Sequence, residues 1–257
     1  MMSFGDPTSL SLLYHLNSEP WQNTEAYQNA GYEVEYKETE GGDGEVRLAS
    51  QSSNSLLETI RARYSCRQFR PDILPLNTVS LLLSGTYGIL RTDYQVLGGF
   101  PTWLRGVPSA GGLFPLELYV LSQRVNELAD GLYHYNVRRH SLEPLKAARF
   151  ADFESVFYNY PFIENANIVL LISAVFLRIQ KKYGPRGYRY LLLEAGHAAQ
   201  NLCLLASTQG LGSLCMGGYA DARLNAMLGL NSAEEGVVYS VAAGWPGVSP
   251  ALGESSK

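Results

Sequence analysis

The amino-acid sequence predicts an α+β fold in which a mostly antiparallel sheet is flanked by helices. Three apolar segments, at 116–122, 168–176 and 236–244, have the composition of strands. The middle segment, IVLLISAVF, is apolar throughout and rich in β-branched residues, which indicates a central strand. A long stretch from Tyr188 carries apolar residues at helical spacing. Because strands and helices do not alternate as βαβ units, an antiparallel arrangement is favoured.

Local signals predict the segments that precede the long helix. Ser55 and Glu58 form a capping box at the start of a first helix, and a second helix is expected from Asn77. The segment 91–115 is rich in glycine and proline, so we expect it to be irregular. Residues 131–145 have the pattern of a hairpin, with strand-like ends around a polar middle.

The remaining elements lie on either side of the long helix. Residues 150–160 are expected to be helical. The long helix is expected to run into a glycine-rich loop at 210–218, whose exposed backbone N–H groups would suit a planar or anionic ligand. Asp221 is expected to cap a short helix that ends near Gly229.

Size and composition limit the classes to which the protein can belong. A chain of 257 residues can bury a substantial core, and we expect an N-terminal extension and flexible linker over 1–54 before a main domain over 55–257. The formal net charge of −4 argues against nucleic-acid binding. Three cysteines without metal-ligand spacing indicate reduced thiols and no metal site. Without a long apolar run or a signal peptide, a cytoplasmic protein that does not enter the membrane is expected.

Three arginines and a serine lie at the end of the first predicted helix. In the sequence RARYSCR, these residues are Arg61, Arg63, Ser65 and Arg67. They could grip a phosphate, because the guanidinium fork matches phosphate oxygens. The alternative is that arginines at a helix C-terminus offset the helix dipole.

Two other segments could carry chemistry. In PSAGGLFP at 108–115, Ser109 and backbone amides could contact a ligand, or the glycines could serve only the loop's dihedral angles. Lys182 and Tyr183 lie in the basic segment RIQKKYGPRGYRY at 178–190. A buried lysine could be a general base and a tyrosine could relay a proton, whereas the alternative is a solvated basic turn.

The order of these motifs resembles that of the nitroreductase-like flavoproteins. RxRxSxR is followed by PSAGGLFPLELYV, by YRYLLLEAGHAAQNL, by GLGS with GG, and by AAGWP. The chain is most similar to the SagB-type branch, the azoline oxidases of thiazole- and oxazole-modified peptides. The resemblance covers about residues 55–247 and extends to SLLYHLNS at 11–18. It implies a nitroreductase-like fold and a homodimer with FMN at the subunit interface.

The resemblance also implies roles for individual residues. The arginine and serine group would hold the phosphate, ribityl chain or pyrimidine edge of FMN, the segment around Ser109 would reach the flavin from the partner subunit, and a glycine N–H would face flavin N5. The implied cofactor-binding residues are Arg61, Arg63, Ser65, Arg67, Pro108, Ser109, Ala110, Gln200, Asn201, Gly217 and Gly218. Lys182 and Tyr183 match a Lys-Tyr pair that is tied to catalysis in this branch.

The activity that the resemblance implies is the oxidation of peptide azolines to azoles in natural-product peptide biosynthesis. Lys182 or Tyr183 would take a proton, flavin N5 would take a hydride, and dioxygen would reoxidise FMN. The modified precursor peptide would be the substrate and a ring-forming cyclodehydratase the partner. One alternative is an NAD(P)H-dependent FMN reductase for nitro, quinone or dehydroamino-acid substrates. Another is a non-catalytic scaffold subunit of a peptide-modifying complex.

The sequence departs from the family pattern in two places. Many members place a basic residue shortly after the last strand to bind the phosphate, but GWPGVSP follows here. Tyr64 also stands at the second position of the usual Arg-Arg-Ser run. Phosphate binding is therefore expected to depend more on Arg61, Arg63 and Arg67, or on a basic residue elsewhere.

Overall fold

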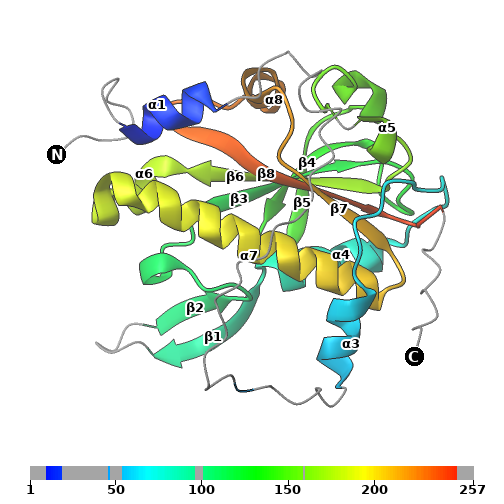
Figure 1. Ribbon diagram of the computed structural model, residues 1–257, viewed down its shortest axis with the longest axis horizontal. Helices are drawn as coiled ribbons and strands as arrows, with labels where there is room; N and C mark the ends of the chain where they lie inside the picture. Colours follow the sequence, from blue (N-terminus) through cyan, green and yellow to red (C-terminus); the bar gives the residue numbers. More distant parts are fainter. Residues whose placement is uncertain (1–9, 19–45, 47–53, 96–100, 159, 248–257) are drawn as a thin grey trace.

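A computed structural model describes residues 10–18, 46, 54–95, 101–158 and 160–247. At its centre is a six-stranded sheet with the order β5-β4-β3-β6-β8-β7, in which every neighbouring pair is antiparallel (Figure 1). The strands are β3 Leu116–Ser122, β4 Gly131–Asn136, β5 Ser141–Lys146, β6 Ile168–Val175, β7 Gly212–Met216 and β8 Glu235–Gly244. The predicted α+β class with a mostly antiparallel sheet is confirmed.

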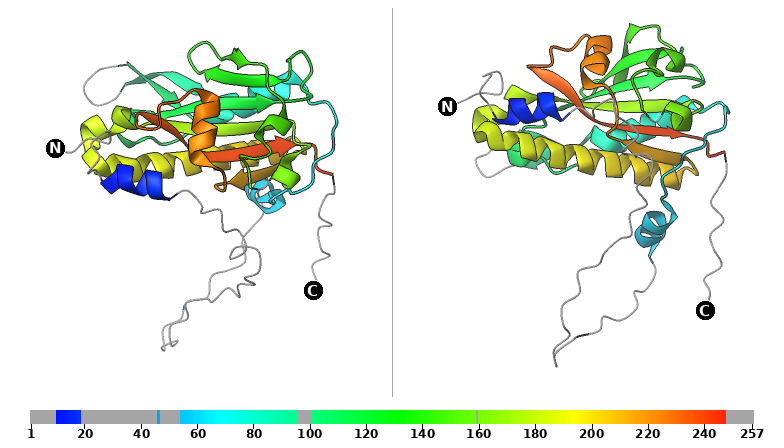
Figure 2. Two further views of the ribbon diagram at one scale, coloured as in Figure 1. Left: turned by 90° about the horizontal axis from the view of Figure 1, so that it is seen from above. Right: turned by 45° about the horizontal axis from the view of Figure 1, so that its top comes forward.

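Helices flank this sheet. They are α1 Leu10–Asn17, α3 Ser55–Ala62, α4 Leu76–Tyr87, α5 Tyr160–Ile163, α6 Phe176–Tyr183, α7 Gly187–Thr208 and α8 Asp221–Leu228. The long helix α7 packs with α4 and α6 over one face, and α5 and α8 contribute to the core on the other (Figures 1 and 2). A separate two-stranded sheet is formed by β1 Ile89–Gln95 and β2 Pro101–Arg105.

Alternate residues of the central strands belong to two separate cores. In β6, Leu170 and Ile172 face the core shared with α4 and α7, whereas Val169 and Leu171 face the core shared with α8. Side chains of a strand point to opposite faces in turn, so a strand covered on both faces must be apolar at every position. This requirement explains the uninterrupted apolar sequence of β6, the expected central strand.

The start of α3 differs in detail from the prediction. Its N-cap is Asn54, whose side-chain oxygen accepts a hydrogen bond of 2.9 Å from the backbone N–H of Leu57. Ser55 is the first helical residue, so the predicted capping box of Ser55 and Glu58 is wrong. Asparagine is as good an N-cap as serine, which is why either residue could have taken the role. The helix near Asn77 and the hairpin over 131–145 are confirmed.

Two segments expected to be irregular contain strands. The antiparallel pair β1–β2 lies largely within 91–115, where Trp103 has a side chain that favours strands. Within 210–218, β7 pairs with β8 at the edge of the sheet. The sequence SLCM between the glycines is compatible with a strand, and Gly212 takes the first position. Glycine content alone therefore overestimated the irregular backbone in both places.

Lys182 and Tyr183 are the last two residues of a helix, α6, and not part of a turn. Lys182 is exposed, so the expected burial of this lysine is wrong, and a solvated basic segment remains the alternative. Phe176 and Ile179 are buried and attach α6 to the core. Residues 150–160 do not form one helix, because a short 3-10 helix at Phe150–Phe153 is separated from α5 by turns.

The predicted end of α8 is confirmed, but its predicted N-cap is wrong. Asp221 is its first residue and Ala220 is the N-cap, so Asp221 does not cap the helix with its side chain. Gly229 ends the helix in the left-handed conformation, with φ 73°, as predicted from its sequence position.

Most of the predicted extension over 1–54 lies outside the described residues, and the domain boundary stays a prediction. The described helix α1 attaches to the start of α7, since His15 Nδ1 lies 3.0 Å from the hydroxyl of Tyr188. Within the described ranges, every helix is too short or too polar to cross a bilayer. The same ranges contain no cluster of three or more His, Cys, Asp or Glu residues suited to a metal ion.

Asn167 joins three segments at one end of the sheet. Its fully buried amide donates hydrogen bonds to the carbonyl oxygens of Asp72 at 2.8 Å and Arg124 at 3.2 Å. Its oxygen accepts a bond of 3.3 Å from the backbone N–H of Trp245. These bonds connect the segment after α3, the turn after β3 and the end of β8.

Replacing Asn167 with Ala should lower the free energy of unfolding by about 2–4 kcal/mol, because buried carbonyl and N–H groups would lose their partners. Urea denaturation measures the loss. Asn126→Ala is the matched control, since Asn126 is exposed and its side chain makes one bond of 3.4 Å to Glu127. The control should change stability by less than about 0.5 kcal/mol. Equal losses in the two variants would contradict the assigned role of Asn167.

Candidate functional site

Lys182 and Tyr183 lie against the segment 108–115. A Cβ built on Gly111 would lie 2.7 Å from Nζ of Lys182 and 2.8 Å from the hydroxyl oxygen of Tyr183. Such contacts are too short for a real side chain, and the φ of 64° at Gly111 also favours glycine. The fold thus brings together two motifs that are far apart in the sequence.

The segment 108–115 is held as a tight turn by its own groups. The hydroxyl of Ser109 accepts a hydrogen bond of 2.9 Å from the N–H of Phe114, and the N–H of Gly112 donates to the carbonyl of Ser109 at 3.0 Å. Phe114 has a φ of 44°, an uncommon conformation for a non-glycine residue. Pro108 is exposed and Ala110 half-buried beside this turn. The flavin contacts expected of these residues stay predictions.

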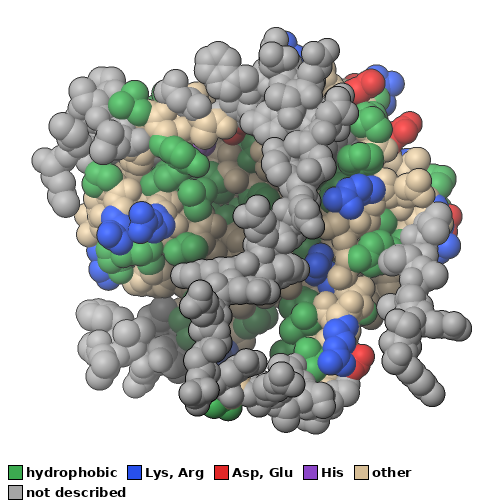
Figure 3. All heavy atoms as spheres, viewed as in Figure 1, with side chains coloured by type: hydrophobic (Ala, Val, Ile, Leu, Met, Phe, Trp, Pro, Cys, Tyr) green, Lys and Arg blue, Asp and Glu red, His purple; other side chains and the backbone are tan. Residues whose placement is uncertain are grey.

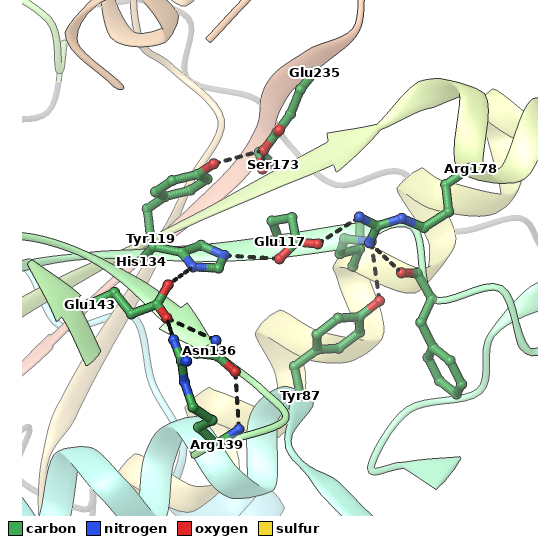
Figure 4. A network of polar contacts seen from close by, with 12 residues as sticks. Tyr87, Glu117, Tyr119, His134, Asn136, Arg139, Glu143, Ser173, Arg178 and Glu235 are labelled. Carbon is green, nitrogen blue, oxygen red and sulfur yellow. Dashed lines mark hydrogen bonds and ion pairs between the residues drawn. The ribbon is translucent and has the colours of Figure 1, made fainter. Parts of the chain in front are cut away.

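Arg178 fastens α6 to the same turn. Its Nη1 donates to the carbonyl oxygen of Phe114 at 3.0 Å, and its Nη2 lies 2.7 Å from Oε1 of Glu117 in β3 (Figure 4). Arg178 precedes Lys182 by about one helical turn, so these bonds restrain the helix that carries Lys182 and Tyr183. Sequence reasoning missed this arginine. The available signal was the acidic Glu117 in the otherwise apolar segment LELYVLS.

The carboxylate of Glu117 also forms an ion pair with His134. His134 Nε2 lies 3.0 Å from Glu117, and His134 Nδ1 lies 3.2 Å from Glu143, so the imidazole is placed between two carboxylates (Figure 4). The bond to Glu117 raises the pKa of His134, although burial opposes the shift. Burial acts to raise the pKa of Glu117, but bonds from His134 and Arg178 outweigh it and hold that pKa below its usual value.

A second buried polar cluster holds the segment 108–115 in place. The hydroxyl of Tyr87 donates to Glu194 at 2.6 Å and accepts from the N–H of Leu116 at 3.2 Å. The guanidinium of Arg105 lies 4.3 Å from the centre of the Tyr87 ring. Burial raises the pKa of Glu194. This cluster connects α4, α7 and the start of β3, and thereby fixes the position of the segment 108–115.

Arg63, Ser65 and Arg67 lie at a different place, on the segment that follows α3. Ser65 forms a parallel bridge with Ser213, which attaches this segment to β7. Arg63 is half-buried and its charge favours the thiolate form of Cys215, while Ser65 and Arg67 are exposed. The predicted cationic and hydroxyl groups therefore lie together beside one edge of the sheet.

The glycines expected near flavin N5 follow this edge strand directly. Gly217 is exposed, and a Cβ built on it would meet nothing within 4 Å. The carbonyl of Gly218 accepts a hydrogen bond of 3.3 Å from the N–H of Tyr158. Approach to the backbone of Gly217 is therefore open.

Arg61, the remaining arginine of the predicted group, pairs with Glu58 at 3.0 Å on the exposed surface of α3.

Gln200 and Asn201 lie on α7. Gln200 is exposed, whereas the amide of Asn201 donates to the carbonyl oxygens of Gly85 at 3.3 Å and Gly106 at 3.0 Å. Asn201 thus joins α4 to the segment after β2. The cofactor contacts expected of both residues stay predictions.

The two groups of candidate residues are separated along α7. Tyr183 packs edge-on against Tyr190, with ring centres 5.1 Å apart, and the sulfur of Cys215 lies 3.5 Å from that of Cys203. Tyr190 and Cys203 are about 20 Å apart along the helix axis, at about 1.5 Å per residue. A single chain therefore has the Lys-Tyr pair, at the end of α6, near the start of α7, and the arginine-serine segment, after α3, towards the end of α7. Figure 1 shows α6 and α3 at these two ends of α7.

The outer face of α7 is partly apolar. Leu192 and Leu193 have exposed fractions of 38% and 57%. Arg189 and Gly196 are also exposed. Figure 3 shows apolar and basic side chains mixed at the surface over the end where α6 and α7 meet. Such a face is suited to contact with another protein surface.

The histidine between the two carboxylates should make stability depend on pH. Because its pKa is raised in the folded protein, His134 stabilises the fold fully below its unfolded pKa of about 6.5. That contribution is lost as pH rises through the folded pKa. Urea denaturation should therefore show a larger cost of His134→Gln near pH 5.5 than near pH 8.5.

Glu117→Gln provides the matched comparison for this pH dependence. It removes the carboxylate that contributes most to the raised pKa of His134. In the Glu117→Gln background, the cost of His134→Gln should vary much less with pH. A cost that is the same at both pH values in the wild-type background would contradict the assignment.

Three curated proteins are related to the chain. MJ1384 of Methanocaldococcus jannaschii, a protein named for the nitroreductases, is 34% identical over 189 residues, covering 73% of this chain and 91% of MJ1384. The trifolitoxin-processing protein TfxB of Rhizobium leguminosarum bv. trifolii is 31% identical over 152 residues, covering 55% and 39%. The microcin B17-processing protein McbC of Escherichia coli is 29% identical over 126 residues, covering 46% and 45%. The chain thus matches less than half the length of either processing protein.

Solved structures share the fold. A chain of the E. coli microcin synthetase McbBCD complex, solved with truncated pro-MccB17 bound, has a TM-score of 0.63 at 24% identity, covering 88% of this chain and 81% of that one. A nitroreductase-fold protein from Desulfovibrio desulfuricans, crystallised in complex with FMN, has a TM-score of 0.54 at 19% identity, covering 77% and 90%. The model of the Nitroreductase family matches residues 60–245, well over half of the sequence. The chain therefore belongs to the Nitroreductase family and is an oxidoreductase of the flavoprotein type.

Proposed function

We propose that this chain oxidises azoline rings of a precursor peptide to azoles, with FMN as its cofactor. The observation that carries the proposal is the convergence of Lys182 and Tyr183 on Gly111, which puts two proton-transfer groups beside an open glycine turn. Relatives named for trifolitoxin and microcin B17 processing support a peptide as the substrate. Family membership supports FMN.

The residues beside β7 fit this cofactor. Arg63 and Arg67 would provide positive charge for the phosphate or the pyrimidine oxygens, and Ser65 would provide a hydroxyl. Gly217 would present its backbone N–H; this residue is exposed, and a Cβ built on it would meet nothing within 4 Å. When bound, FMN supplies a two-electron acceptor for the ring hydrogen that leaves as hydride.

The Lys-Tyr pair would take the other ring hydrogen as a proton. Nζ of Lys182 lies 5.4 Å from the centre of the Tyr183 ring, so both groups would act on the same small volume next to Gly111. Arg178 would act as a positioning residue, since it holds α6 to Phe114. Restraint of this kind keeps a base within reach of a bound substrate.

A complete site would require two copies of the chain. Tyr190 and Cys203, the residues of α7 that Tyr183 and Cys215 contact, are about 20 Å apart along the helix, so one chain would not bring the Lys-Tyr pair and the Arg63 segment together. Antiparallel pairing of α7 with its copy, through the exposed face with Leu192 and Leu193, would place the start of one helix beside the end of the other. By the symmetry of such a homodimer, two equivalent sites would form.

The substrate would reach this protein with its azoline ring already closed. A cyclodehydratase that condenses a side-chain thiol or hydroxyl with the preceding peptide carbonyl would therefore be the partner enzyme. The fold shared with a chain of the McbBCD microcin synthetase complex is consistent with an enzyme that acts as one subunit of such a complex.

The protein should purify yellow and should remove two hydrogens per ring from an azoline peptide, as measured by mass spectrometry. Lys182→Ala and Tyr183→Phe should keep the flavin absorbance but slow azole formation by about 100-fold or more, the usual contribution of a general base. Lys181→Ala is the matched control, since Lys181 is the exposed neighbour on the same helix. Its rate should be unchanged.

Three outcomes would count against this proposal. Normal rates in both Lys182 and Tyr183 variants would exclude the pair as the base. Rapid bleaching of the flavin by NADPH without peptide, and no azole product, would instead indicate the NAD(P)H-dependent reductase. A protein that stays colourless in excess FMN would indicate the scaffold role.

Sites shared between subunits can be tested by mixing two inactive variants. Arg63→Ala removes one half of each site and Lys182→Ala removes the other. After subunit exchange at equal concentrations, half of the dimers would be mixed, and each would contain one intact site, so about one quarter of the wild-type sites should return. Assays of azole formation before and after exchange measure the gain. Activity that does not increase on mixing would show that both groups serve the same protomer.

A further inference from the structure

Cys203 and Cys215 form a close pair of thiols outside the proposed proton-transfer site. Cys203 lies in the C-terminal half of α7 and Cys215 in the edge strand β7. Their sulfur atoms are 3.5 Å apart, and both cysteines are free thiols. The two residues thus meet across the interface between a helix and a strand.

The two thiols differ in access to solvent. Cys203 has an exposed fraction of 2%, whereas Cys215 is only partly buried. Cys66, the third cysteine, has an exposed fraction of 1%, and its Sγ donates to the carbonyl oxygen of Gln68 at 3.1 Å. Cys215 is therefore the thiol that a small reagent can reach first, and Cys203 is the one placed to react with it afterwards.

The surroundings of Cys215 favour its ionised form. The hydrogen bond from Cys203 lowers the pKa of Cys215, with further help from Tyr239 of β8 and from the charge of Arg63 after α3, while burial opposes the shift. The same contact, together with burial, raises the pKa of Cys203. A thiolate is the attacking form in thiol–disulfide exchange, so the more accessible member of the pair is also the nucleophilic one.

We propose that Cys203 and Cys215 are a redox-active pair that closes reversibly to an intramolecular disulfide when the protein meets a low-molecular-weight disulfide. The Cys215 thiolate attacks one sulfur of the reagent and expels a thiolate. The Cys203 thiol then loses its proton and attacks the Cys215 sulfur, and the second small thiolate leaves. The protein loses two electrons and two protons, and the reagent is reduced to two thiols.

Closure would link α7 covalently to β7. The sulfur atoms must move from 3.5 Å to about 2.05 Å, the length of a disulfide bond. The bond would lie two residues before Gly217 and would remove the negative charge that faces Arg63. Oxidation would thus act on the strand that carries the proposed cofactor contacts, although formation of the disulfide does not depend on the proposed function.

Peptide mapping gives a direct test, because both cysteines fall in one tryptic peptide, 190–223, and Cys66 falls in another. The full-length protein, saturated with FMN, is incubated with oxidised glutathione, alkylated and digested without reductant. Peptide 190–223 should lose two hydrogens and take no alkyl group, and dithiothreitol should restore two alkylation sites. Two alkylated cysteines after oxidation, or a glutathione adduct that never resolves, would overturn the proposal.

Three variants assign the roles of the individual thiols. Cys203→Ser should trap a stable glutathione adduct on Cys215, because no second thiol can displace it. Cys215→Ser should leave Cys203 unmodified, because Cys203 is buried. Cys66→Ser is the control and should form the disulfide as the wild type does. A Cys66→Ser protein without the disulfide, or a Cys215→Ser protein with an adduct on Cys203, would contradict the assigned roles.

Discussion

The packing of α7 against the sheet is the constraint on which the rest of the structure depends. Its buried face contains the small residues Ala195, Ala198, Ala199, Cys203 and Ala206, which let the 22-residue helix lie close to the apolar strands. Close packing over such a length fixes both ends of the helix relative to the sheet. The Lys-Tyr pair is positioned by contacts near the start of α7, and the Arg63 segment by contacts near its end.

Near the start of α7, polar contacts add to the apolar packing in fixing the positions of α6 and the turn that contains Gly111. Arg178 joins α6 to the carbonyl of Phe114 and to Glu117, and Tyr87 joins Glu194 to the backbone of Leu116. Partly buried charges of this kind need partners, so each bond also restricts the turn that contains Gly111. Towards the other end of the helix, β7 connects the Arg63 segment, the thiol pair and Gly217. Cofactor binding and redox chemistry would therefore share one strand.

Much of the fold could be predicted from the sequence because the strong signals are periodic. The apolar run of β6 and the helical spacing of α7 predicted their elements, and Gly229 predicted the end of α8. Weaker signals failed where two residue types could serve equally, as with Asn54 and Ser55, or where glycines next to a strand suggested a loop. In those places pairing with neighbouring strands and burial decided the structure, and neither can be read from a short window of sequence.

The sequence by itself determined the family, because the order of its motifs can be recognised without knowing the distances between residues in the structure. It also indicated Lys182 and Tyr183 as a pair, since they are adjacent in the chain. Only the tertiary structure brought that pair to Gly111, placed Arg178 on Glu117, and set Cys203 beside Cys215. Contacts between distant segments depend on how helices and strands pack, and packing is a property of three-dimensional shape that local sequence patterns do not encode.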